Sequence, residues 1–401
     1  MQMKRYVSLY VHIPFCAVKC KYCDFLSFDG ESYGTMLRYV DSLCQEIKMY
    51  KPISDEYIVR TIFIGGGTPS LLDESLITNI MAFIKRTFTV EKNAEVTIEA
   101  NPGTLRHQKL NGYKAAGINR ISIGLQSADD AMLKKLGRIH NFDQFVASYN
   151  AARRAGFNNI NIDIMSGLPG QTIHSYVDTL SKVLEYQPEH ISAYSLSIEE
   201  GTPFSRDSEI LESLPPEMID RRMYEITQKL LAAKGYDRYE FSNYAKSGYE
   251  CKHNMVYWTG GEYIGFGIGA SSYFQGKRFN NMKNILEYID IMEKLSEQFV
   301  QADNMEVLYN DTAKLIRENV TPVYIDARME EFMFLGLRMT CGISREDFYE
   351  RFNKDIYEVY GPVLNKYITE GYMGAQGDRI FLTNAGIDVS NVILSNFLLD
   401  K

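Results

Sequence analysis

Short apolar runs and amphipathic stretches alternate along the first half of the chain. Residues 60–64, Arg-Thr-Ile-Phe-Ile, show the apolar run of a buried strand, whereas residues 33–50 carry apolar side chains at three- and four-residue steps, which indicates a helix. Runs of the first kind predict strands at residues 7–13, 60–64, 95–100, 119–124, 159–165 and 190–197. Helices are predicted at residues 33–50, 73–87, after 101–104, at 142–155 and at 173–186.

This alternation predicts a parallel sheet whose strands are joined by crossover helices. The unit recurs about every 35 residues, but the units differ in sequence, so the pattern does not indicate a solenoid. A closed eightfold barrel needs roughly 250 residues, and the six predicted units cover fewer than that. We therefore predict an α/β fold with an open, partial (β/α)6 barrel over residues 1–210.

The rest of the chain is predicted to form two further parts. Residues 211–300 are assigned to an extension of the barrel, with a helix at 214–235, an edge strand at 236–244 and a glycine-rich loop at 260–269. Residues 301–401 are assigned to a separate, mostly helical domain. Its predicted elements are helices at 311–319, 326–339, 344–352 and 356–370 and a hairpin-like pair at 371–374 and 378–383.

Composition narrows the classes of function. The net charge of −8 argues against a nucleic-acid partner, which needs a basic surface. No apolar run approaches the roughly 20 residues that span a bilayer, and the first residues lack the features of a signal peptide. Six cysteines, three of them close together, do not suggest a disulfide framework. We expect a cytoplasmic protein with reduced thiols.

Three of the cysteines, Cys16, Cys20 and Cys23, follow the first predicted strand with the spacing C-x3-C-x2-C. Three thiolates on one loop can hold three corners of a [4Fe–4S] cube and leave the fourth iron open for another ligand. Zinc ligation or plain burial are the alternatives. Structural zinc usually comes from two pairs of ligands, and the other cysteines are scattered along the chain. The spacing therefore favours the cluster.

Polar residues and glycines follow the next predicted strands, where the chemistry of parallel barrels is found. Residues 65–69, Gly-Gly-Gly-Thr-Pro, allow a close backbone approach, although a tight turn alone would explain them. Glu99 ends the third strand and could instead be a solvated or helix-capping carboxylate. Asp163 lies among apolar residues, where a carboxylate is costly unless it is paired. Arg138 could fork two hydrogen bonds onto a carboxylate.

The cysteine motif, with Tyr22 before its last cysteine, resembles the signature of the radical S-adenosylmethionine (SAM) superfamily. Residues 167–171, Gly-Leu-Pro-Gly-Gln, are typical of its HemN/HemW branch. The resemblance implies a (β/α)6 core, a winged-helix-like C-terminal domain, and a [4Fe–4S] cluster whose open iron binds SAM. It implies that SAM contacts Tyr10, Gly66, Gly67, Thr68, Glu99, Gln126, Arg138 and Asp163.

That branch contains oxygen-independent coproporphyrinogen III oxidases and haem chaperones. The oxidases carry a fourth cysteine two residues after the third, where this chain has Phe25, and they have a longer segment before the cysteines. Residues 253–258, His-Asn-Met-Val-Tyr-Trp, match the H-N-x-x-Y-W motif of the chaperones, which makes His253 the predicted haem ligand. Cys251 could add a thiolate ligand. The alternative is that this motif closes a loop, with the imidazole hydrogen-bonded in the interior.

Taken together, the resemblance implies a haem chaperone that delivers haem to apo-haemoproteins, with a radical coproporphyrinogen oxidase as the alternative. Whether the chain is an enzyme depends on whether it cleaves SAM productively, which the sequence leaves open. A DNA-binding role for the winged helix is poorly supported by the acidic charge. The recipient haemoprotein, a transient membrane contact and dimer formation stay open too.

Overall fold

The computed structural model describes residues 4–301 and 305–399. Its centre is a sheet in which six strands run parallel in the order β1-β4-β5-β6-β7-β8. These strands are Arg5–Ile13, Tyr57–Gly66, Thr89–Ala100, Arg120–Gln126, Ile160–Ser166 and His190–Ser195. Each overlaps one of the six predicted strands, so the α/β prediction is confirmed.

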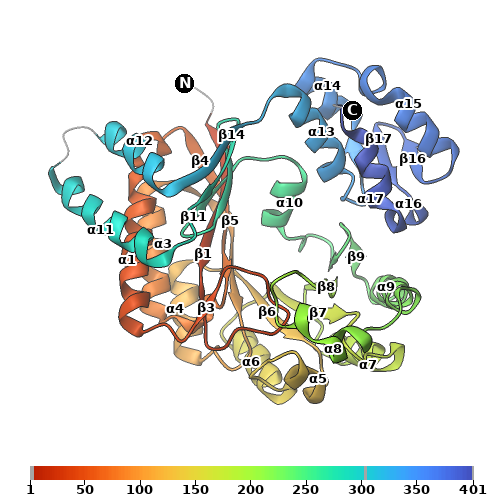
Figure 1. The fold of residues 1–401 in the computed structure, drawn as a ribbon, viewed down its shortest axis with the longest axis horizontal. Helices are drawn as coiled ribbons and strands as arrows, with labels where there is room; N and C mark the ends of the chain where they lie inside the picture. Colours follow the sequence, from red (N-terminus) through yellow and green to blue (C-terminus); the bar gives the residue numbers. More distant parts are fainter. Residues whose placement is uncertain (1–3, 302–304, 400–401) are drawn as a thin grey trace.

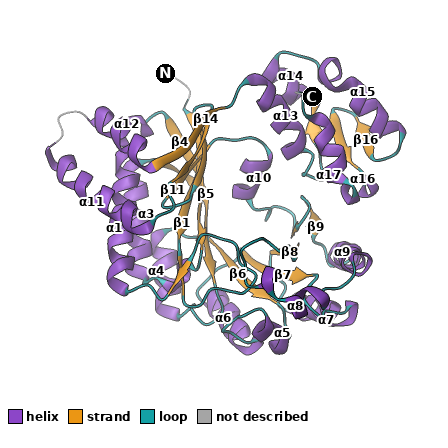
Figure 2. Ribbon diagram, viewed as in Figure 1, coloured by secondary structure: helices purple, strands orange, loops and turns teal. Residues whose placement is uncertain are grey.

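Helices cover the outer face of this curved sheet (Figure 2). They are α1 (Tyr33–Met49), α3 (Glu74–Thr87), α4 (His107–Ala116), α5 (Asp130–Lys135), α6 (Phe142–Arg154) and α7 (Ile173–Glu185), with a short α2 at Lys51–Ser54. Local sequence explains where they begin, because Ser32, Asn141 and Thr172 accept hydrogen bonds from the first turns of α1, α6 and α7. Burial of one apolar face then holds each helix against the sheet.

Shorter strands extend the sheet on both sides and leave it open. Beside β1 lie β11 (Tyr263–Phe266), β12 (Ser271–Phe274), β13 (Lys277–Asn281) and β14 (Arg317–Pro322), and beside β8 lie β10 (Asn243–Ala245) and β9 (Asp237–Arg238). The outermost strands in the described chain, β14 and β9, do not pair with each other, so the barrel is partial, as predicted.

Three predicted elements differ from the structure. The glycine-rich loop at 260–269 contains β11, where a Cβ on Gly265 would stand 2.4 Å from the Ser271 carbonyl oxygen, so glycine permits strand pairing here. The edge strand at 236–244 is split into β9 and β10. The helix at 311–319 is α12 (Met305–Ile316), which ends where β14 begins.

The C-terminal part is a helical domain with a small wing. It contains α13 (Ile325–Gly336), α14 (Arg345–Phe352), α15 (Ile356–Thr369), α16 (Asn384–Asp388), α17 (Ser390–Leu394) and the 3-10 turn η3 (Ser395–Phe397). Its wing is a three-stranded sheet in the order β15-β17-β16, formed by Ile343–Ser344, Arg379–Leu382 and Met373–Gln376. The predicted hairpin-like pair is thus confirmed as β16 and β17.

The two largest hydrophobic cores of the described residues do not divide at residue 300. The predicted boundary falls within α11 (Ile285–Gln301), which packs on α1, and Tyr309 and Ile316 of α12 also belong to the barrel core. The second core begins at Met329. Residues 302–304 and 400–401, which the predicted C-terminal domain includes, lie outside the described residues.

Two helices connect the barrel with the C-terminal domain. Helix α9 (Glu217–Ala232), close to the predicted helix at 214–235, packs on α7, and its Arg221 forms an ion pair with Asp388 of α16. Helix α10 (Lys252–Trp258) contacts β4 and α13 and lies between the sheet and the C-terminal domain (Figure 1). In the described part of the chain, no helix is long and apolar enough to cross a membrane.

Candidate functional site

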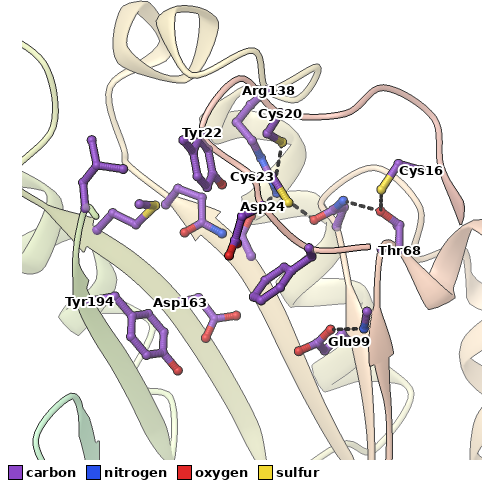
Figure 3. A pocket seen from close by; sticks show the side chains of 18 of the residues that line it. Cys16, Cys20, Tyr22, Cys23, Asp24, Thr68, Glu99, Arg138, Asp163 and Tyr194 are labelled. Carbon is purple, nitrogen blue, oxygen red and sulfur yellow. Dashed lines mark hydrogen bonds between the residues drawn. The ribbon is translucent and has the colours of Figure 1, made fainter. Parts of the chain in front are cut away.

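A cavity of about 390 Å³ lies between the cysteine loop and the carboxyl ends of the parallel strands. Figure 3 shows the cysteine side chains along one side of it and the carboxylates of Glu99 and Asp163 on the other. Among its lining residues are the three cysteines and seven of the eight predicted SAM-binding residues, namely Gly66, Gly67, Thr68, Glu99, Gln126, Arg138 and Asp163. The carboxyl edge of the sheet therefore brings these predicted residues into one site.

Tyr10 is the exception, because it is not among the residues that line the cavity. Its ring packs against Phe63 with a centroid distance of 6.3 Å, and its hydroxyl is 3.0 Å from His12 Nδ1. Tyr10 lies in β1 before the cysteine loop begins. In this conformation it supports the strands beneath the cavity rather than its wall.

Backbone contacts join the glycine segment to the cysteine loop. The Gly67 N–H donates to the Ile13 carbonyl oxygen at 2.8 Å, and the Thr68 N–H donates to the Phe15 carbonyl oxygen at 2.7 Å. A Cβ on Gly67 would stand 2.8 Å from that Phe15 oxygen and 3.0 Å from Cys16 Sγ. Close approach to the loop, and not only a turn, therefore requires glycine here.

Replacement of Gly67 by alanine is expected to push the cysteine loop away from β4. The new methyl group meets backbone atoms that cannot rotate away, so we expect a loss of about 1–3 kcal/mol in the free energy of unfolding, together with a lower iron content after reconstitution. Denaturant unfolding and iron analysis measure the two effects. The control is Gly34→Ala, since a Cβ on Gly34 in α1 has no neighbour closer than 3.6 Å. Equal iron content in both variants would contradict this expectation.

One hydrogen-bonded chain of side chains connects two of the thiols. The Thr68 hydroxyl donates to Cys16 Sγ at 3.6 Å and accepts from Asn101 Nδ2 at 2.9 Å. Asn101 Oδ1 accepts from Arg138 Nη2 at 2.7 Å, and Arg138 Nη1 donates to Cys20 Sγ at 3.4 Å. Figure 3 shows this chain above the cavity. Arg138 therefore contacts the cysteine loop directly.

Asn101 lines the cavity and directly follows the third strand, but no role was predicted for it from the sequence. The same is true of Tyr194, Ser195 and Ser197, which line the far end of the cavity at the end of the sixth strand. The signal for these residues was their position at strand ends. This signal is weak because serine, asparagine and tyrosine are common in loops.

The carboxylates in the cavity are held in different ways. Glu99 Oε2 accepts from the Gly66 N–H at 3.0 Å, and burial, with the nearby Asp163, raises the pKa of Glu99 to about 8. Asp163 accepts from Ser122 Oγ at 3.0 Å and from Asn161 Nδ2 at 2.7 Å, while burial raises its pKa as well. Burial disfavours the charged form of both acids. A cation bound in the cavity would therefore stabilise both carboxylates and lower their pKa values.

Gln126 lies at an irregular position of β6. Its φ is +71°, in the left-handed region that is rare for residues other than glycine, and the pairing register of β6 with β7 shifts between Gly124 and Gln126. Such bulges redirect side chains at strand ends and are common beside active sites. Here the bulge places Gln126 in the cavity wall.

The donor set fits an iron–sulfur cluster. No three His, Cys, Asp or Glu side chains in the described residues are grouped to hold one metal ion. A cube instead takes each thiolate at a separate corner, which three thiols spread along one cavity wall can provide. All three cysteines are free and partly exposed. This arrangement suits a [4Fe–4S] cluster better than a single zinc ion.

The H-N-x-x-Y-W motif forms α10 instead of a loop, and His253 points into the interior. His253 is 1% exposed, its Nδ1 is 2.7 Å from Thr61 Oγ1, and its Nε2 is 2.9 Å from Tyr257 Oη. Burial lowers the pKa of His253 to about 3, so the ring is neutral. Both ring nitrogens are occupied, and neither is available to an iron in this conformation.

Cys251, the other predicted haem-ligand candidate, is also buried. It is 0% exposed, and burial raises its pKa to about 12. Its thiol lies 3.6 Å from Glu95 Oε1, which also accepts the His253 N–H at 3.1 Å. Cys251 is therefore a neutral thiol that anchors the start of α10.

Comparison with known proteins identifies the family. The radical SAM superfamily domain matches residues 10–183, and the HemN C-terminal domain matches residues 326–389. Heme chaperone HemW of Bacillus subtilis (strain 168) is 35% identical over 396 residues, which cover 98% of this chain and 99% of that protein. The chain belongs to the HemW family. Heme chaperone HemW of Escherichia coli (strain K12) is 40% identical over 268 residues, covering 66% of this chain and 69% of the relative.

One solved structure has the same fold over nearly the whole chain. Coproporphyrinogen III oxidase (HemN) from Escherichia coli, a radical SAM enzyme, superimposes with a TM-score of 0.82 at 23% identity, covering 99% of this chain and 91% of that one. Within the HemW family, the radical SAM domain implies a [4Fe–4S] cluster and SAM. The cavity described above is the place where the residues predicted for both of them meet.

Proposed function

We propose that this HemW-family chain is a haem chaperone, which binds haem and delivers it to apo-haemoproteins. The observation that carries the proposal is the similarity, over nearly the whole chain, to proteins named Heme chaperone HemW. Two features of the sequence also support the proposal. Position 25 is phenylalanine instead of a fourth cysteine, and α10 contains the H-N-x-x-Y-W motif. Delivery in the cytoplasm stays a prediction.

In this proposal Cys16, Cys20 and Cys23 hold the cluster and SAM lies in the cavity. The bound cluster supplies an open iron and an electron donor for SAM. The chain's own residues orient the two: Arg138 and Thr68 hold the cysteine loop through hydrogen bonds, and the Gly66 backbone positions Glu99. Glu99 and Asp163 would face the positive charge of SAM, which favours their ionised forms.

His253 can bind haem iron only if one of its ring nitrogens is released from its present hydrogen bond. Iron could reach the ring only after it leaves Thr61 or Tyr257, which costs buried hydrogen bonds. We therefore expect ligation by His253 to need a local rearrangement of α10. A His253→Ala variant that folds and keeps full haem affinity would rule out this role.

The decisive experiment distinguishes directed transfer from passive release. The reconstituted chain is loaded with haem and mixed either with an apo-haemoprotein from the same cell or with apomyoglobin, which collects haem that dissociates freely. A chaperone transfers to its own acceptor faster than to apomyoglobin, and the rate rises with acceptor concentration. Equal rates that do not depend on acceptor concentration would overturn the proposal.

The same preparation tests the oxidase alternative. The fold similarity to HemN does not establish that activity, because it shows only that the chains share an architecture. With SAM, a reductant and coproporphyrinogen III, we expect no protoporphyrinogen under anaerobic conditions. Robust product formation would make decarboxylation the main activity.

A further inference from the structure

The side chain of Asn101 lies between the two residues that donate hydrogen bonds to the cysteine thiols. Its Nδ2 is 2.9 Å from Thr68 Oγ1, and its Oδ1 is 2.7 Å from Arg138 Nη2. Thr68 donates to Cys16 Sγ, and Arg138 donates to Cys20 Sγ. Figure 3 shows Thr68 beside Cys16 and Arg138 beside Cys20. Asn101 therefore joins the donors that face two of the three predicted cluster ligands.

The backbone of Asn101 is held independently of its side chain. Its N–H donates to Ser70 Oγ at 3.2 Å, and its carbonyl oxygen accepts from the Thr104 N–H at 3.2 Å and from the Thr104 hydroxyl at 2.7 Å. These contacts use only backbone atoms of Asn101, so a change of its side chain leaves them in place. A substitution at this position therefore tests the amide group alone.

The chemistry of the partners determines the direction of each hydrogen bond. A guanidinium can only donate, so the amide oxygen of Asn101 must face Arg138. The amide NH₂ group then faces Thr68, whose hydroxyl oxygen accepts. A hydroxyl carries a single proton, and that proton is left for Cys16 Sγ at 3.6 Å. Asn101 thus turns the Thr68 proton toward the sulfur.

Donors on sulfur matter for a cluster because an added electron increases the negative charge on its ligands. The reduction potential of an iron–sulfur cluster depends on hydrogen bonds to its sulfurs and on solvent exposure. Thr68 is only 4% exposed, so water does not readily take the place of its hydroxyl. Arg138 Nη2 also donates to the Gly124 carbonyl oxygen at 2.7 Å, which holds the guanidinium in place. Loss of either donor should make the cluster harder to reduce.

We propose that Asn101 is a positioning residue that directs hydrogen bonds onto Cys16 and Cys20 and thereby raises the reduction potential of the cluster. The inference rests on the cluster assignment made under the proposed function. It adds a residue that controls how readily the cluster takes up an electron. Asn101 acts through Thr68 and Arg138, and the order of the three side chains carries the effect.

The first test is Asn101→Asp, which keeps an oxygen for Arg138 but loses the amide donor. The Thr68 hydroxyl then donates to the new carboxylate instead of Cys16. We expect the midpoint potential to fall by about 59 mV, which is a tenfold change in the ratio of oxidised to reduced cluster for a one-electron couple. A redox titration of the reconstituted chain without SAM, followed by electron paramagnetic resonance, measures the midpoint. Asn111→Asp is the matched control, because it adds the same charge on an exposed position of α4 outside the cavity.

A second pair of variants separates the hydrogen bond from the added charge. Thr68→Val removes the hydroxyl and should lower the midpoint, whereas Thr68→Ser keeps the hydroxyl and should restore the wild-type value. In the Thr68→Val background, Asn101→Asp should cause a smaller shift than in the wild-type chain, because the two residues act through one hydrogen bond.

Three outcomes would overturn the proposal. They are an unchanged midpoint in Asn101→Asp, an equal shift of Asn101→Asp in both backgrounds, and equal midpoints in Thr68→Val and Thr68→Ser. The last comparison decides the matter if Asn101→Asp fails to fold or to take up a cluster. If the wild-type chain itself takes up no cluster, the cluster assignment fails, and this inference fails with it.

Discussion

Replacing Cys16, Cys20 or Cys23 with alanine is expected to abolish the [4Fe–4S] cluster after anaerobic reconstitution. Only three cysteines reach the cavity, so each loss removes one protein corner of the cube. Iron and sulfide content and the visible absorbance of the cluster measure the effect. SAM binding should fall in the same variants, because SAM would lose its iron.

The control for this prediction is Cys341→Ala. Cys341 is free and exposed in the C-terminal domain and does not line the cavity. The Cys341→Ala variant should keep the iron content of the wild-type chain. Retention of a full cluster in a Cys20→Ala variant would contradict the assignment of the three-cysteine loop.

Glu99→Gln is expected to remove a pH dependence from the stability of the cluster-free chain. Burial raises the pKa of Glu99 from 4.5 to about 8, so between these pH values the folded chain keeps a proton that the unfolded chain has released. The free energy of unfolding therefore falls as the pH rises through this range. Each pKa unit is worth about 1.4 kcal/mol, and cavity water screens part of the effect, so we expect a loss of about 2–4 kcal/mol.

Urea unfolding at about pH 5 and about pH 9 measures this difference. Glutamine cannot ionise, so the Glu99→Gln variant should lose less stability over that interval. Glu91→Gln serves as the control, because Glu91 lies in the same strand with a side chain that is 44% exposed, paired with Arg60 at the surface. An identical pH dependence for wild type and Glu99→Gln would show that Glu99 ionises normally.

The cavity and α10 are connected inside the barrel. Asp163 accepts from Asn161, whose Oδ1 lies 2.6 Å from His190 Nδ1, and His190 Nε2 lies 2.8 Å from the Tyr239 hydroxyl. That hydroxyl accepts the Cys251 N–H at 3.2 Å, at the start of α10. Polar residues that looked isolated in the sequence thus form one hydrogen-bonded interior, which explains how the strands can bury them.

Most of the barrel could be predicted because its signals are local. Apolar runs and helical periodicity reflect burial against a sheet, and each of the six strands appeared as such a run. β11 has no clear local signal, because Tyr263–Phe266 contains a glycine and lies between other glycines. The strand forms by pairing with β1, which lies about 250 residues earlier in the chain. The split of the predicted edge strand into β9 and β10 has the same cause, since strand ends depend on partners.

The sequence by itself determined the cysteine spacing, the six parallel strands and the residues at their ends. These follow from covalent neighbours and from the rule that parallel strands end at one edge. Only the tertiary structure decided that Tyr10 lies outside the cavity wall, that His253 is buried with both nitrogens bonded, and that Arg338 faces Trp258 across the domain boundary. Most of these contacts join residues far apart in the chain, and their energies depend on burial, which no local pattern contains.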